Sequence, residues 1–242
     1  MFNKEIIFSS PWSEVISPPV PSVQRIPDVY KQLTKRYPFW GPTGGTIKRC
    51  IPFLDALTTG YIITWPIDVC IVVEDIIIKD KQQRHVYMEV SHEVPKEFND
   101  KFFLSSHSNL QVPEDLRTQH RTINVPLKVG NPWHIKTPPG YSCIFTQPFS
   151  RNLPYQIIDG VVDTDDFPLN VNFPGFWVND TSIKETHIAK GTPMALVIPF
   201  KRENWKMKLS NKDTQTPHNF MKIGTYLVDN YKKVFWKKKS YK

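Results

Sequence analysis

The sequence is poor in cysteine and glycine, with 3 cysteines and 10 glycines among 242 residues that include 22 prolines. Cys50, Cys70 and Cys143 are far apart and form no Cys-x-x-Cys pair, which argues against a disulfide framework and a zinc ribbon and favours a reducing compartment. No run approaches the roughly 18 apolar residues of a membrane span, and the N-terminal residues lack the apolar core of a signal peptide. We therefore expect neither a membrane span nor a secretion signal.

Local catalytic and metal-binding motifs are also missing. The 7 histidines never occur as His-x-His, His-x-Asp, His-x-Glu or His-Glu-x-x-His, so we expect no metal site; the alternative is a ligand set assembled from histidines that are distant in the sequence. A Gly-x-Ser-x-Gly turn is absent, and no cysteine adjoins a histidine. Residues 41–48 resemble a phosphate-binding loop, but Thr46 replaces a required glycine, and we interpret this segment as a turn.

The positive charge is concentrated at the C-terminal end. The net charge is +8, yet residues 201–242 hold 12 Lys and Arg against 3 Asp and Glu, and residues 1–200 are nearly neutral. A polyanion hypothesis therefore concerns this tail, where Lys232, Lys233 and Lys237 to Lys239 are clustered. The alternative, a solvated lysine face on a docked helix, stays open.

Short β-branched and alternating segments dominate the middle of the chain and are typical of strands. Pro126 within one of them predicts an edge strand. Because no helical segment separates these strands, we expect a mainly β, antiparallel jelly roll or distorted barrel over residues 47–200. The expected strands are 69–73 with 76–78, paired as a hairpin with 85–90, and then 123–129, 141–146, 155–162, 169–173 and 194–200.

Three regions are expected along the chain. Residues 1–36 form a Pro-rich arm, residues 37–200 form the β-rich core, and residues 201–242 form a basic tail. Thr216 and Pro217 predict a helix start in this tail. The apolar stripe of the expected helix consists of Phe220, Ile223, Leu227, Tyr231 and Val234.

Acidic residues cluster near the end of an expected strand. Asp159, Asp163 and Asp165 are two or four residues apart, which places them on one face if the strand is regular. Such carboxylates can hold a divalent cation or orient a water molecule. The alternative is a solvated turn that ends the strand. Pro168 and Pro174 occupy positions that exclude a calcium-binding EF-hand loop.

Four short motifs follow one another in the same part of the chain, at residues 139–141 (Pro-Gly-Tyr), 149–151 (Phe-Ser-Arg), 160–165 (Gly-Val-Val-Asp-Thr-Asp) and 191–195 (Gly-Thr-Pro-Met-Ala). In order and spacing, residues 138–200 resemble the core of the trimeric dUTPases, and 59–61 matches the first family motif more loosely. The whole chain is also similar to an uncharacterised family of marine bacteriophage proteins.

This resemblance implies a dUTPase-like fold and a nucleotide site. Asp163 would activate the attacking water, the backbone of Gly160 to Val162 would read the base, Ser150 and Arg151 would hold phosphates, and Mg²⁺ would be the cofactor of hydrolysis. The implied ligand-binding set is Ser150, Arg151, Gly160, Val161, Val162, Asp163 and Asp165.

The chain departs from the dUTPase pattern at several positions. Asp166 or Phe167 stands where the stacking tyrosine is expected, and Leu196 replaces a glutamine. Gly224 is the only glycine beyond residue 200, so the glycine-rich arm that would exclude water is missing. Proteins that share a fold often differ in the reaction that they catalyse, so the resemblance supports the fold more than the activity.

Two functions follow from these observations. The favoured one is a phage-type, non-catalytic binding or virion assembly module that needs no cofactor, forms a homotrimer and contacts phage structural proteins or nucleic acid through its tail. The alternative is a Mg²⁺-dependent nucleoside triphosphate pyrophosphatase or a nucleotide sensor. In either case we expect the protein in the cytoplasm of the infected bacterium or in the virion, without a membrane partner.

Overall fold

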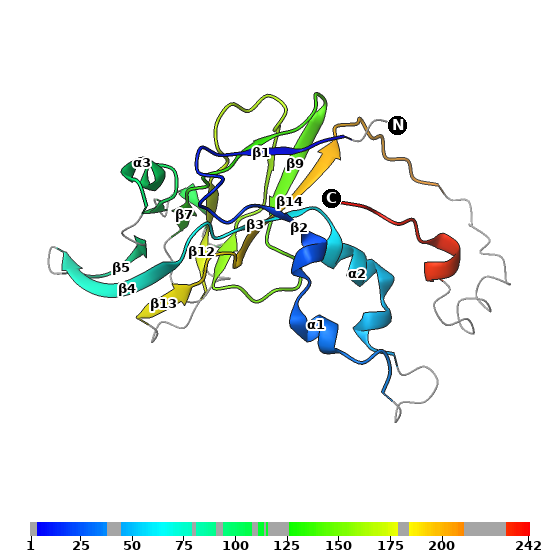
Figure 1. Cartoon of the computed structure of the whole chain (residues 1–242), viewed down its shortest axis with the longest axis horizontal. Coiled ribbons are helices and arrows are strands. Elements are labelled where there is room, and N and C mark those ends of the chain that lie inside the picture. The colour runs from blue at the N-terminus through cyan, green and yellow to red at the C-terminus, as the bar shows by residue number, and fades with distance from the viewer. Residues whose placement is uncertain are drawn as a thin grey trace.

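The computed structural model describes residues 4–37, 45–78, 81–90, 94–107, 111–113, 115, 126–178, 184–210 and 231–242, without the side chains at 76, 78, 81–84 and 234. The described strands form four sheets in which every strand pair is antiparallel (Figure 1). The expected mainly β, antiparallel architecture is confirmed, and the described strands do not close into a barrel. No helix within these residues is long and apolar enough to cross a membrane.

The largest sheet has five strands in the order β11-β9-β14-β3-β2. Gly60 precedes β3 with a φ of 72°, and an added Cβ would lie 2.3 Å from the Val197 carbonyl oxygen of β14, so this position requires glycine. The strands are β11 (Gly160–Val162), β9 (Tyr141–Thr146), β14 (Pro193–Lys201), β3 (Tyr61–Thr64) and β2 (Val20–Pro21).

A second sheet has four strands in the order β10-β12-β7-β6. Its buried side chains share one core with those of the five-stranded sheet. In this core the ring centroids of Phe145 and Phe173 are 6.0 Å apart, and those of Trp65 and Tyr155 are 6.3 Å apart. Burying such large aromatic side chains is the main source of stability. The strands are β10 (Tyr155–Ile157), β12 (Phe173–Trp177), β7 (Leu127–Val129) and β6 (Leu104–Ser106).

Three sequence-based predictions fail in these two sheets. Residues 155–162 form two strands that belong to different sheets, and residues 169–172 precede β12 instead of belonging to it. β7 lies between two neighbours, so the prediction of an edge strand from Pro126 is wrong. Pro126 immediately precedes β7, where its missing N–H costs no ladder hydrogen bond.

A long hairpin forms the third sheet, with the strand order β13-β4-β5. Figure 1 shows this hairpin extending away from the two larger sheets, on the side opposite to α1 and α2. The predicted hairpin is confirmed, and ten residues of each strand are in register. The strands are β4 (Val69–Ile78), β5 (Lys81–Val90) and β13 (Glu185–Ile188).

The N-terminal region is joined to the body by short strands and helices. β1 (Ile7–Ser9) pairs with β8 (His134–Lys136), and Trp12 packs edge-on against Phe98 at 5.3 Å. The sequence did not predict α2 (Ile51–Thr58), which buries Ile51 and Leu57. The helical elements are η1 (Ser22–Arg25), α1 (Asp28–Gln32), η3 (Ile47–Arg49), α2 (Ile51–Thr58), α3 (Lys96–Asn99) and the π-helix η5 (Tyr231–Phe235).

The C-terminal helix prediction lies mostly outside the described residues. Of the expected apolar stripe, Phe220, Ile223 and Leu227 are not described, and Tyr231 begins the π-helix with 45% of its surface exposed. The last residues, drawn in red in Figure 1, return to contact α2.

Candidate functional site

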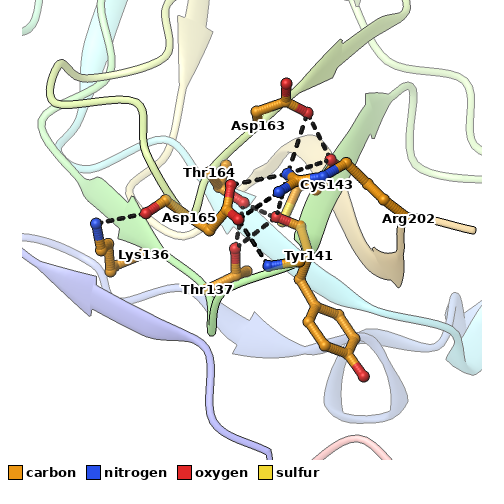
Figure 2. A network of polar contacts seen from close by, with 10 residues as sticks. Lys136, Thr137, Tyr141, Cys143, Asp163, Thr164, Asp165 and Arg202 are labelled. Carbon is orange, nitrogen blue, oxygen red and sulfur yellow. Dashed lines mark hydrogen bonds and ion pairs between the residues drawn. The ribbon is translucent and has the colours of Figure 1, made fainter.

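The turn after β11 carries Asp163 and Asp165, and both carboxylates meet Arg202 from the end of β14 (Figure 2). The guanidinium donates to the two oxygens of Asp165 at 2.8 and 2.5 Å. The backbone N–H of Gly140 donates to Asp165 Oδ2 at 2.7 Å, and Lys136 donates to its carbonyl oxygen at 2.6 Å. Asp165 therefore holds together the ends of β8, β9 and β14.

This bidentate pair changes the acidity of Asp165. Hydrogen bonds from Arg202 lower the pKa of Asp165 to about 2, although partial burial opposes the shift. Only 8% of the Asp165 side chain is exposed, so the paired carboxylate is covered by its partners. Asp165 is thus a structural anion with little surface left for a ligand.

Asp163 is more accessible but also has partners. Its side chain is 69% exposed, accepts a hydrogen bond from Ser142 Oγ at 2.6 Å, and lies 3.3 Å from the Arg202 guanidinium. Backbone N–H groups of Asp166 and Phe167 donate to its carbonyl oxygen. Asp163 therefore sits in a hydrogen-bonded turn. Because β11 spans only Gly160–Val162, the regular strand that would place Asp159, Asp163 and Asp165 on one face is not formed.

Beneath this ion pair lies a buried hydroxyl pair. Thr137 Oγ1 and Thr164 Oγ1 are 2.7 Å apart, and Thr164 also donates to Cys143 Sγ at 3.3 Å. Burial raises the pKa of Cys143 to about 11. Such a thiol stays protonated at neutral pH, so Cys143 is unsuited to act as a nucleophile.

A hollow of about 790 Å³ lies at the other end of β9 and β11. It contains Ser150, with a φ of 55°, and Arg151, whose pKa is lowered by burial and then by repulsion from Arg25. Arg151 also donates to the Arg25 carbonyl oxygen. Asp159 at the edge of the hollow accepts a hydrogen bond from Thr146 at 2.5 Å.

The structure therefore places the predicted ligand-binding residues in two locations. In the β11–β9 pair, Gly160 lies opposite Phe145 and Val162 lies opposite Cys143. Ser150 and Arg151 belong to the hollow beyond Gly160, whereas Asp163 and Asp165 follow Val162 at the opposite end of the strand. The side chain of Val161, between them, is 64% exposed on this edge strand.

A second hollow, of about 570 Å³, is lined by basic side chains that sequence reasoning did not connect. No carboxylate belongs to its described lining, and Tyr30, Ile51 and Leu54 supply its apolar part. Lys48 Nζ donates to the carbonyl oxygens of Lys31 and Leu33, which positions its ammonium group. We call this site the basic hollow, and its cationic residues are Lys35, Arg36, Lys48, Arg49 and Lys232.

The tail reaches the basic hollow because α2 binds its end. Trp236 Nε1 donates to both carboxylate oxygens of Asp55 at 3.0 Å, and Lys239 pairs with the same carboxylate at 2.5 Å. The hydrogen bond to Asp55 raises the pKa of Lys239. Tyr241 packs edge-on against Tyr61 at 5.9 Å.

The five predicted polyanion-binding lysines are therefore not equivalent. Lys232 lines the basic hollow and Lys239 is paired with Asp55, whereas Lys233, Lys237 and Lys238 are exposed. The sequence signal for the rest of the hollow was the basic pairs at 35–36 and 48–49. The two pairs are separated in the sequence, and only the folded structure brings them to one site.

Within the described residues, side chains with metal-ligating chemistry converge at one further place. Cys70, Glu185 and His187 have ligand atoms that all lie within 4.8 Å of one another. The sequence search tested His-x-Glu and overlooked the reverse order, Glu-x-His, at 185–187. It could not find Cys70, which is more than 100 positions away and becomes adjacent only through strand pairing.

Comparison with known proteins gives no assignment. No protein-family model, no curated protein and no solved structure matches the chain.

Proposed function

We propose that the protein is a non-catalytic binding module that holds the phosphate groups of a nucleic-acid strand in the basic hollow. The observation that carries this proposal is the convergence of five cationic side chains from three segments around one cavity without a carboxylate in its described lining. Phosphate backbones are bound mainly by such clusters of Lys and Arg.

The exposed lysines beside the hollow favour an extended ligand over a single phosphate. Lys233 follows Lys232 directly, and Lys237 and Lys238 lie in the exposed segment that continues from it. A strand seated in the basic hollow would meet further positive charge along the tail. The apolar part of the hollow is formed by Leu54 and by the buried residues Tyr30 and Ile51.

The surroundings of Asp163 support binding over hydrolysis. A general base must reach the water that attacks a substrate held by its phosphate ligands. Here Asp163 engages Ser142 and Arg202, whereas Ser150 and Arg151 line a hollow at the opposite end of β11. For this reason the Mg²⁺-dependent pyrophosphatase is the less favoured function.

A nucleotide sensor is the second candidate, and the hollow beside Ser150 and Arg151 is the observation that favours it. The sequence resemblance adds two features to the proposed binding module, namely a dUTPase-like trimer and a role in phage assembly. Both binding functions predict ligand capture without turnover, but at different hollows.

Fluorescence anisotropy with a labelled single-stranded oligonucleotide tests the proposal. The variant Lys35→Gln/Arg36→Gln/Lys232→Gln should bind more weakly and reduce the salt dependence of log K by about 0.7 for each lost contact. The control Lys233→Gln/Lys237→Gln/Lys238→Gln removes the same charge outside the hollow and should weaken binding less. Equal losses in both variants would refute the basic hollow as the site.

A hydrolysis assay separates the alternatives. Deoxynucleoside triphosphates with Mg²⁺ should release no pyrophosphate, and Asp163→Asn should leave oligonucleotide binding unchanged. Turnover that Asp163→Asn abolishes would instead establish the pyrophosphatase. Triphosphate binding that Arg151→Gln removes and the basic-hollow variant retains would establish the sensor.

A further inference from the structure

We propose that Cys70, Glu185 and His187 form a Zn²⁺ site that links β13 to β4. The thiol, imidazole and carboxylate ligand atoms all lie within 4.8 Å of one another. Sulfur, nitrogen and oxygen ligands of these three kinds are the set that Zn²⁺ binds in proteins. A thiolate and an imidazole together disfavour Mg²⁺ and Ca²⁺, which prefer oxygen ligands alone.

The fold holds the three residues on adjacent strands. In the antiparallel β13–β4 pair, His187 lies directly opposite Cys70, and Glu185 lies opposite Val72. Because side chains alternate along a strand, residues 185 and 187 share one face of the sheet with Cys70. The backbone spacing of the ligands is therefore set by ladder hydrogen bonds.

The side chains have the freedom to close on an ion. Zn–S and Zn–N bonds of about 2.3 and 2.0 Å place tetrahedral ligands about 3.3 to 3.8 Å apart. Contraction from within 4.8 Å requires only side-chain rotation, because Glu185 and His187 are exposed and Cys70 is half-buried. Among the described residues, the side chains of Glu185 and His187 have no hydrogen-bond or ion-pair partner that would hold them back.

A fourth ligand is available across the hairpin. Glu89 of β5 lies opposite Cys70 on the side away from β13. Cys70, Glu89 and His187 line the same hollow of about 490 Å³, which also has room for a bound water molecule. The site can therefore reach four-coordination with Glu89 or with water.

The local charge is unfavourable without a cation. Two carboxyl-bearing residues flank Cys70 in the sheet, since Glu89 lies directly opposite it in β5 and Glu185 lies two positions from its partner His187 in β13. The nearby lysines serve other partners, since Lys184 pairs with Asp75 at 3.1 Å and Lys190 Nζ donates to the Val15 carbonyl oxygen. A divalent ion would balance the carboxylates and favour the thiolate.

Isothermal titration of the reduced full-length chain with ZnCl₂, after treatment with a chelator, tests this site. We expect one ion per chain and a thermal midpoint that rises with Zn²⁺. Cys70→Ser and His187→Gln should each weaken binding at least tenfold, and Glu185→Gln should weaken it less. Cys50→Ser and His85→Gln are matched controls and should bind as the parent does.

Cobalt supplies a second measurement that reports on the thiolate itself. Co²⁺ added to the parent should produce a thiolate-to-metal charge-transfer band that Cys70→Ser lacks and Cys50→Ser retains. Because His187 is exposed, His187→Gln should fold. This variant therefore still tests the site if Cys70→Ser fails to fold. Absence of stoichiometric Zn²⁺ binding, or equal binding by the parent and His187→Gln, would overturn the proposal.

Discussion

Replacing Trp236 by phenylalanine should weaken the docking of the C-terminal segment on α2. The indole N–H of Trp236 donates to both carboxylate oxygens of Asp55 at 3.0 Å, and the Asp55 side chain is 16% exposed. Phenylalanine keeps most of the apolar contact and lacks the indole N–H donor. The substitution therefore tests mainly the contribution of this hydrogen bond to docking.

The size of the effect follows from the geometry. A hydrogen bond to a charged group contributes about 1.5 to 3 kcal/mol. Because Trp236 is half-buried and water can replace the lost donor, the lower value of about 1.5 kcal/mol applies. This corresponds to roughly a tenfold increase in the population of the released segment.

Limited trypsin digestion measures that population when cleavage is slower than docking. Cleavage after residues 237–239, followed by mass spectrometry, should be about tenfold faster in Trp236→Phe. Trp205→Phe is the matched control, because Trp205 is 88% exposed and should leave the rate unchanged. Asp55→Asn should also speed cleavage, and the double variant should show less than the sum of both effects.

Two outcomes would refute this reasoning. If Trp236→Phe is cleaved at the rate of the parent, the contact with Asp55 does not hold the tail. If Trp205→Phe accelerates cleavage equally, the effect belongs to the loss of any indole ring and not to this hydrogen bond.

Two further predictions concern the core and the ion pair. Asp165→Asn should destabilise the protein at neutral pH, and the difference should shrink as pH falls from the ordinary pKa of 3.8 toward about 2, where the carboxylate loses its charge; denaturant unfolding across pH checks this, and a pH-independent difference would contradict it. Tyr155→Phe should lower the free energy of unfolding by about 1 to 2 kcal/mol, because the buried hydroxyl donates to the Phe173 carbonyl oxygen at 2.7 Å. Unchanged unfolding in urea would show that this bond contributes nothing net.

Strand predictions succeeded where the segment is bounded by strong turn residues. Residues 141–146 are one strand as predicted, and the expected hairpin forms at 69–90. Alternation of apolar and polar residues misled at 169–173, since Asn170 and Asn172 hydrogen-bond the backbone of Asn131 in a loop. A period of two in the sequence does not distinguish a half-buried strand from a loop whose polar side chains serve another segment.

The candidate sites depended even more on tertiary structure. The resemblance to dUTPases implied that Ser150, Arg151, Asp163 and Asp165 belong to one ligand site. The register of β11 on β9 separates the first two from the last two, and Arg202 pairs with both carboxylates. Whether an acid serves ligand binding or structure depends on its spatial partner, which lies 37 positions away from Asp165.

The sequence by itself determined the mainly β character, the long hairpin and the concentration of positive charge at the C-terminal end, because alternation, turn residues and charge are local properties. The tertiary structure alone decided which lysine lines the basic hollow, which one pairs with Asp55, and that Cys70 meets His187. These are contacts between segments far apart in the chain. They depend on strand register and helix docking, which the packing of the whole core decides.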